Sequence, residues 1–194
     1  MDIEVGRVIR SSTTRFSVGC KVLRPQVPAF GSLVKAQAVG GEEIYGLIYE
    51  VRMDDDPFVR QMAVAGQDLR PEHVEDMRRN RQVPIEVGVL VVGHRAGQEV
   101  RHYLPPQPPL SLDVILACSS QELVRFSERF DYFRLVLDNF DVPADELLAA
   151  HLRQAAGARG AAGRDFLVDA GRTLASLLVL DLARLEALLR RLRP

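Results

Sequence analysis

The spacing of apolar and polar residues divides the chain into two unlike halves. In the first hundred residues apolar side chains alternate with polar or small ones, as in residues 3–8 and 14–18, which is the period of a half-buried β-strand. After residue 118 apolar residues recur every three or four positions, as on one face of an α-helix. We therefore expect an α+β protein, in which a small closed antiparallel β-barrel is followed by a C-terminal helical segment.

Short turn signals separate the strands that we expect in the first half. Residues 11–13 are polar and predict a turn between the first two strands. Gly40 and Gly41 predict a hairpin that leads into a strand at residues 44–51. Gly46 lies inside that strand and indicates a bend, which a small barrel needs at its corners.

Further elements are expected before the barrel ends. The aspartates and proline of residues 54–57 end the strand in a solvated loop, and we interpret them as a loop rather than a cation site. Residues 59–65 are a candidate strand, and residues 71–78 have the proline, acids and terminal arginine of a short helix. Residues 84–93 and 99–104 predict a hairpin.

A proline-rich run marks the change between the halves. Four prolines fall within residues 105–109, and proline cannot donate to a strand ladder. We expect a rigid linker here, although such a run also suits a ligand of a proline-binding domain. The predicted organisation is a β-barrel domain at residues 1–104, a linker at 105–117 and an α-helical domain at 118–194.

An aromatic-rich seam follows the linker. Its members are spaced alternately by three and four residues after a possible N-cap at Ser119, which predicts one helix that ends before Pro143. We expect this seam to pack on the other helices or the barrel rather than in an intermolecular coiled coil, although a partner seam stays an alternative. The seam consists of Leu123, Phe126, Phe130, Phe133, Leu137 and Phe140.

Two further helices are expected after the seam. Residues 143–153 begin with proline and acids and end with basic residues, which suits the helix dipole. Glycines and alanines at residues 157–164 predict a flexible break. Leucines at helical spacing from Leu174 to Leu192 predict a last helix, whose arginines lie largely off the apolar stripe.

Composition narrows the classes of function. The chain of 194 residues has 25 basic and 26 acidic residues and is 47% apolar, which supports a packed core without a global positive charge for nucleic acid or anionic lipid. The N-terminus lacks the pattern of a secretory signal, and the longest apolar run is too short for a membrane span. We expect a cytoplasmic protein without membrane contact.

No sequence motif indicates an active site or a cofactor-binding site. The glycines at residues 157–163 are not followed by the Lys-Ser/Thr pair of a phosphate-binding loop, and neither cysteine lies in a metal-binding or nucleophile motif. His94 and His102 lie on the two strands of a predicted hairpin, and we expect an exposed pair on the barrel rim. We therefore predict no catalytic residue, no metal site and no cofactor.

Three short glycine motifs lie in the first half of the chain, and they are formed by Gly6 and Val8, by Gly31 and Val34, and by Gly46 and Ile48. They resemble the motifs of the HAS-barrel family, named for its occurrence in HerA and ATP synthase. In that family G-x-V with a Ser/Thr turn, G-x-x-V and G-x-V/I lie on strands that close a small barrel. The resemblance implies an assembly module, because such barrels cap a DNA-translocating hexamer and bind a nuclease partner, or hold together the ring of a rotary ATPase. Here a helical segment replaces the ATPase domain.

Two functions follow as hypotheses. The first is a non-enzymatic protein-binding or assembly module, an adaptor for a separate HerA-like or other ring ATPase, with self-association into a homo-oligomer left open. The second is a nucleic-acid-binding adaptor in DNA processing or RNA metabolism. It depends on the compact basic cluster formed by Arg78, Arg79 and Arg81.

Overall fold

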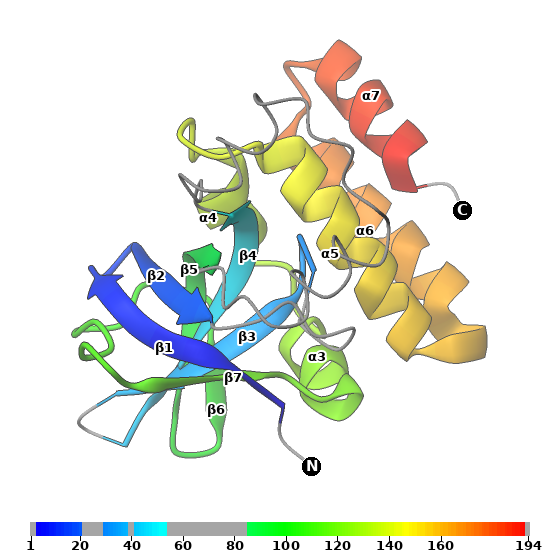
Figure 1. Cartoon of the computed structure of the whole chain (residues 1–194). Helices are drawn as coiled ribbons and strands as arrows, with labels where there is room; N and C mark the ends of the chain where they lie inside the picture. The colour runs from blue at the N-terminus through cyan, green and yellow to red at the C-terminus, as the bar shows by residue number, and fades with distance from the viewer. Residues whose placement is uncertain (1–2, 21–28, 39–40, 54–84, 193–194) are drawn as a thin grey trace, which may run out of the picture.

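The computed structural model of the chain describes residues 3–20, 29–38, 41–53 and 85–192. Its N-terminal part is an antiparallel sheet with the strand order β2-β1-β7-β3-β4-β5-β6 (Figure 1). Pairing between β2 and β5 closes six of these strands into a barrel, and β6 extends β5 outside the ring. The strands are β1 (Glu4–Ser11), β2 (Arg15–Cys20), β3 (Leu33–Gln37), β4 (Glu43–Met53), β5 (Ile85–Ala96), β6 (Glu99–Arg101) and β7 (Val114–Ala117).

The expected α+β architecture is confirmed, with a closed barrel before a helical segment. The hairpins β3–β4 and β5–β6 form where glycines predicted turns, with Gly41 and Gly97 at positive φ. The bend expected at Gly46 is present, since the register of β4 against β5 shifts between Tyr45 and Gly46. A side chain at Gly46 would meet Val89, so the close approach of the two strands requires glycine.

Strand β5 is apolar on both faces because it separates two hydrophobic cores. Val89 and Val91 point into the barrel and belong to its core, together with side chains such as Val18 and Ile115. Leu90 lies on the opposite face, in a second core made by the outer side of the barrel and the helices. The barrel and the helical segment therefore share one packed interface.

The boundary of the barrel lies later than the sequence predicts. Residues 114–117, which we expected in the linker, form β7, which pairs with β1 and β3 and is part of the ring. The prolines of residues 105–109 lie outside the strands, as expected of residues that cannot donate a backbone hydrogen bond. Residues 114–118 are a short continuous apolar run, which is compatible with a buried strand but also with a buried helical segment, so its position after the prolines led to its assignment to the linker.

The helical segment is divided into more helices than the spacing predicts. The single helix expected from residue 119 to Pro143 is wrong, because residues 127–132 separate α3 from α4. The single last helix is also wrong, because α6 and α7 are separate and α6 begins within the expected break, just after Gly160 at positive φ. The elements are α3 (Ser120–Phe126), α4 (Phe133–Leu137), α5 (Ala144–Ala158), the 3-10 turn η1 (Gly160–Ala162), α6 (Gly163–Leu177) and α7 (Leu182–Leu192).

Helix α5 is central to this segment. It contacts α3, α4, α6 and α7 and also touches β4 of the barrel (Figure 1). Among the described residues, no helix has the length and hydropathy needed to cross a lipid bilayer. The strand at residues 59–65, the helix at 71–78 and the aspartate loop lie outside the described residues.

Candidate functional site

The predicted seam is distributed between the core and the surface. Phe126, Phe133 and Leu137 are buried in the core shared with the barrel, and Leu123 and Phe130 pack against it. Phe140 departs from this pattern, because α4 ends at Leu137 and leaves the ring 94% exposed. Five of the six seam residues are thus packing residues, and the sixth lies at the surface.

The basic cluster of the nucleic-acid hypothesis, Arg78, Arg79 and Arg81, lies outside the described residues, so that hypothesis stays a prediction. Arginines on the described part of the barrel are matched by carboxylates close by. The ion pairs are Arg7 with Glu4, Arg10 with Glu86, Arg15 with Asp141, Arg52 with Glu50, Arg95 with Glu43 and Arg101 with Glu99.

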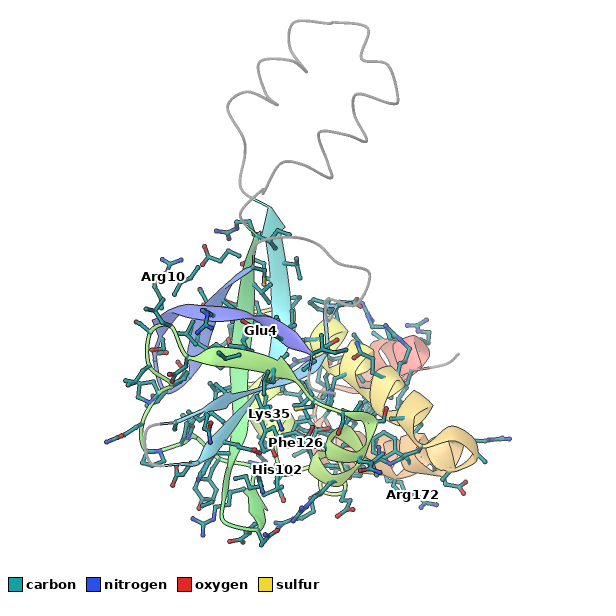
Figure 2. All side chains as sticks on the ribbon, turned by 60° about the horizontal axis from the view of Figure 1, so that its bottom comes forward. Glu4, Arg10, Lys35, His102, Phe126 and Arg172 are labelled. Atoms are coloured by element: carbon teal, nitrogen blue, oxygen red, sulfur yellow. The ribbon has the colours of Figure 1, made fainter. Side chains whose placement is uncertain are left out.

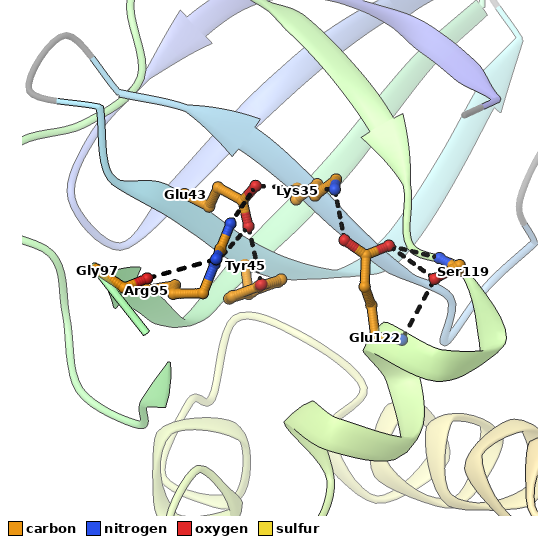
Figure 3. Close-up of polar contacts among 7 residues, drawn as sticks. All are labelled: Lys35, Glu43, Tyr45, Arg95, Gly97, Ser119 and Glu122. Atoms are coloured by element: carbon orange, nitrogen blue, oxygen red, sulfur yellow. Dashed lines mark hydrogen bonds and ion pairs between the residues drawn. The ribbon is translucent and has the colours of Figure 1, made fainter. Parts of the chain in front are cut away.

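A network of charged side chains joins the barrel to α3 (Figure 3). The Lys35 ammonium group on β3 donates a hydrogen bond of 2.5 Å to Glu122 and lies 3.8 Å from Glu43 of β4. Glu43 also accepts hydrogen bonds from Arg95 at 2.9 Å and from the Tyr45 hydroxyl at 3.0 Å. Each charge in this network therefore faces a partner of opposite sign.

The same network fixes the start of α3. Glu122 and Ser119 form a capping box, in which each side chain accepts from the backbone of the other. Burial raises the pKa of the Glu122 carboxyl, but hydrogen bonds from Lys35 and Ser119 outweigh it and the pKa lies below its usual range. Burial acts on Glu43 in the same way and is outweighed by Arg95, so its pKa is also lowered. These carboxylates are held ionised as structural ions.

A second set of polar contacts between the helices and the barrel involves a buried imidazole. His151 of α5 is fully buried, with Nδ1 at 3.3 Å from the Gly31 carbonyl oxygen and Nε2 at 3.1 Å from the Tyr132 hydroxyl. Burial lowers the pKa of His151 to about 4, although the hydrogen bond with Gly31 opposes this effect. Both nitrogens are engaged within the protein, so His151 has no nitrogen left for a substrate.

The expected exposed pair of histidines on the rim is wrong. His94 is buried, with Nδ1 at 3.2 Å from the Tyr103 carbonyl oxygen. His102 lies between the barrel and α3, with Nε2 at 3.0 Å from the Phe126 carbonyl oxygen and its ring 4.7 Å from the Phe126 ring (Figure 2). Helix α3 covers the rim at this point, a tertiary contact that the strand pattern does not contain.

The described residues offer no constellation for metal or nucleophilic chemistry. Within them, no group of three or more histidine, cysteine or carboxylate side chains converges as metal ligands would. Cys20 is buried and its thiol donates to the Val5 carbonyl oxygen, while burial raises its pKa and keeps it protonated. Nδ1 of His102 lies 3.9 Å from Asp131, but Nε2 lies within hydrogen-bond distance of the Phe126 carbonyl oxygen.

The most exposed apolar side chains of the helical segment lie at the end where α4, α5 and α7 meet. We call these four residues the helical tip: Phe140, Val179, Leu180 and Leu182. Leu180 is 98% exposed, and it precedes α7 in the turn after α6. Spacing alone had placed two of them, Phe140 and Leu182, on the apolar faces of longer helices. A signal for three of the four is an adjacent acidic residue, as in Asp138-Asn139-Phe140-Asp141 and Leu180-Asp181-Leu182.

The Arg184 side chain connects the start of α7 to α5 and to the end of α4. Arg184, in the first turn of α7, donates to Asp145 of α5 at 2.9 Å and to the Leu137 carbonyl oxygen at 3.3 Å. Phe140 and Arg184 line the same surface groove of about 260 Å³, which we call the tip groove. The loop that carries Phe140 therefore lies beside the start of α7.

The chain matches no protein-family model, and no curated protein matches it either.

Proposed function

We propose that the chain is a non-enzymatic protein-binding module and that the helical tip is its docking surface. The observation that carries this proposal is the nearly complete exposure of Phe140, which lines the tip groove, and of Leu180, in the turn that precedes α7. Burying one such side chain in a complex contributes about 1.5–3 kcal/mol. Aromatic and apolar anchors of this kind dominate the binding energy of many interfaces.

The interior of the molecule supports a scaffold role. The polar groups at the junction of barrel and helices, Lys35, Glu43, Glu122 and His151, are engaged with one another or with neighbouring protein groups. A site for chemistry needs a base or nucleophile that faces a substrate. A junction with satisfied charges and a shared core instead holds the helices rigidly on the barrel, which suits the presentation of a docking surface.

The partner that we propose is a ring ATPase of the HerA-like kind, for which the chain would act as an adaptor. The closed six-strand barrel agrees with the architecture that the HAS-barrel motifs imply, and the helices stand where that family carries its motor. A cytoplasmic location belongs to this proposal, and the reduced thiol of Cys20 suits a reducing compartment.

The proposal is tested by capture from a lysate of the native cell. The bait is the immobilised chain, compared with the double variant Phe140→Ser/Leu180→Ser and with Val168→Ser as a matched control, since Val168 is a half-exposed apolar residue nearer the other end of α6. The supporting result is an identified ATPase that the wild type and Val168→Ser retain and the double variant loses.

The captured protein is then purified and mixed with the same three baits, and the mass of the complex is measured by light scattering. Because Phe140 and Leu180 make little contact with the core, the double variant should keep the wild-type circular dichroism spectrum and melting temperature. Equal retention by all three baits would show that the helical tip is not the docking surface.

A further inference from the structure

The tip groove is lined by Asp145 and Glu146, and three further aspartates next to the exposed apolar residues form what we call the acidic rim. Asp138 and Asp141 flank Phe140, and Asp181 lies between Leu180 and Leu182. All three aspartates are exposed. The helical tip thus has a carboxylate next to Phe140, Leu180 and Leu182.

The two arginines that line the groove, together with Arg15 of β2, do not neutralise this rim. Arg184 is held by Asp145, Arg191 by Glu146, and Arg15 by Asp141. The Arg184 pKa is raised first by its hydrogen bond with Asp145 and further by the charges of Asp145, Asp181 and Asp138, which places the last two carboxylates near the same guanidinium group. Five carboxylates therefore share three guanidinium groups, and the negative charge is in excess.

The excess of negative charge restricts the kinds of surface that could bind the helical tip. A second copy of the chain in a two-fold dimer would bring one acidic rim against the other. An anionic membrane would be repelled in the same way. A partner that carries lysine or arginine around large apolar side chains would match both the groove and its rim.

We infer that the helical tip binds a positively charged amphipathic helix of its protein partner, whose apolar side chain enters the tip groove while its basic residues face Asp138 and Asp181. A helix fits because the groove lies between packed helical elements, and an amphipathic helix presents anchors three or four residues apart. This inference rests on the proposed function and adds the chemistry of the partner segment to it.

The test uses two designed helical peptides of about 18 residues with the same leucine face. One carries lysine and the other glutamate at the polar positions, and each is labelled with fluorescein. Fluorescence anisotropy with the purified full chain should give at least about tenfold tighter binding of the lysine peptide at about 50 mM salt. The difference should narrow at about 300 mM salt, because the charges are exposed to solvent.

Two variants separate the contributions of the rim and the anchors. Asp138→Lys/Asp181→Asn should remove the preference for the lysine peptide, and asparagine at 181 keeps the oxygen that caps the Arg184 amide. Phe140→Ser/Leu180→Ser should weaken binding of the lysine peptide about tenfold or more. Glu4→Lys/Glu50→Gln makes the same change in net charge at exposed positions of the barrel and should leave the preference intact.

The inference is overturned if both peptides bind equally, if neither binds, or if the barrel variant lowers the preference as much as the rim variant. Each of these results leaves the proposed function standing as long as the captured partner still depends on Phe140 and Leu180. Loss of that dependence would instead remove the proposed function. The two failures are therefore distinguishable.

Discussion

The Nδ1 atom of His151 lies 3.3 Å from the carbonyl oxygen of Gly31, so that a side chain of the central helix is hydrogen-bonded to the loop that enters the barrel at β3. A carbonyl oxygen can only accept, so Nδ1 carries the proton. Nε2 then accepts from the Tyr132 hydroxyl at 3.1 Å. One neutral tautomer of His151 thus connects three separate parts of the chain.

The first prediction concerns the pH dependence of stability. Burial lowers the pKa of His151 to about 4, whereas a histidine in the unfolded chain titrates near pH 6.5. Between these values the unfolded state binds the proton and the folded state does not. The contribution of His151 is therefore complete above about pH 6.5, and the free energy of unfolding falls by about 3 kcal/mol as the pH decreases to about 4.

The measurement is urea unfolding of the wild type and of His151→Gln at several values between about pH 7 and pH 4. Other groups titrate in this range, because burial also lowers the pKa of His102, and hydrogen bonds lower those of Glu43 and Glu122 against the effect of burial. The difference between the two proteins isolates His151 and should shrink as the pH falls. Parallel pH profiles would contradict the prediction.

The same contact shows why the strands could be predicted from the sequence, whereas the packing of the helices on the barrel could not. Strands β1 and β2 and the hairpins carry their signals locally, in the alternation of residues and in turn glycines. His151 and Gly31 are 120 positions apart, and their pairing depends on how α5 packs on the barrel. The break between α3 and α4 has the same origin, because Phe126 and Phe133 enter one core from separate helices.

The second prediction uses two glycines with nearly the same backbone. Gly31 and Gly41 have φ of 83° and 81°, so alanine is strained at both by about 1–2 kcal/mol. At Gly41 an added Cβ meets nothing within 4 Å, whereas at Gly31 it would lie 2.6 Å from the Ala150 Cβ of α5. Gly31→Ala should therefore cost at least about 2 kcal/mol more than Gly41→Ala, since overpacking adds to the strain.

Chemical unfolding of the two variants gives this difference directly, because the conformational cost at φ cancels between them. The unfolding of Gly31→Ala should also begin with loss of the helical segment from the barrel, seen as faster exchange of the Leu148 and Leu152 amides. If the two substitutions cost the same, α5 does not pack against Gly31 as closely as the structure indicates.

The third prediction is a stabilising substitution. Gly157 lies in the last turn of α5, and an added Cβ meets nothing within 4 Å. Alanine at this position should raise the free energy of unfolding by about 0.5–1 kcal/mol, because it restricts the unfolded chain and favours the helix. Thermal unfolding measures the change. A lower melting temperature would indicate that this turn of α5 is covered or strained.

The fourth prediction concerns the ion pair that joins β3 to α3. The Lys35 side chain is 13% exposed and that of Glu122 is 28% exposed, so water screens their attraction only in part. In a double-mutant cycle with Lys35→Met and Glu122→Gln, the coupling energy should be about 1–2 kcal/mol. Glutamine keeps the capping box with Ser119, so the cycle reports the ion pair rather than the start of the helix.

Arg10 and Glu86 provide the control for this cycle. Their atoms lie 2.6 Å apart, but the Arg10 side chain is 73% exposed, and the coupling energy should not exceed about 0.5 kcal/mol. The Lys35–Glu122 coupling should also decline as the pH falls below about 4.3, because a glutamate of the unfolded chain takes up a proton there, whereas the lowered pKa keeps Glu122 of the folded chain ionised to lower pH. Equal couplings for the two pairs would mean that the junction is as open to water as the barrel surface, and the helices would then be held by the apolar core alone.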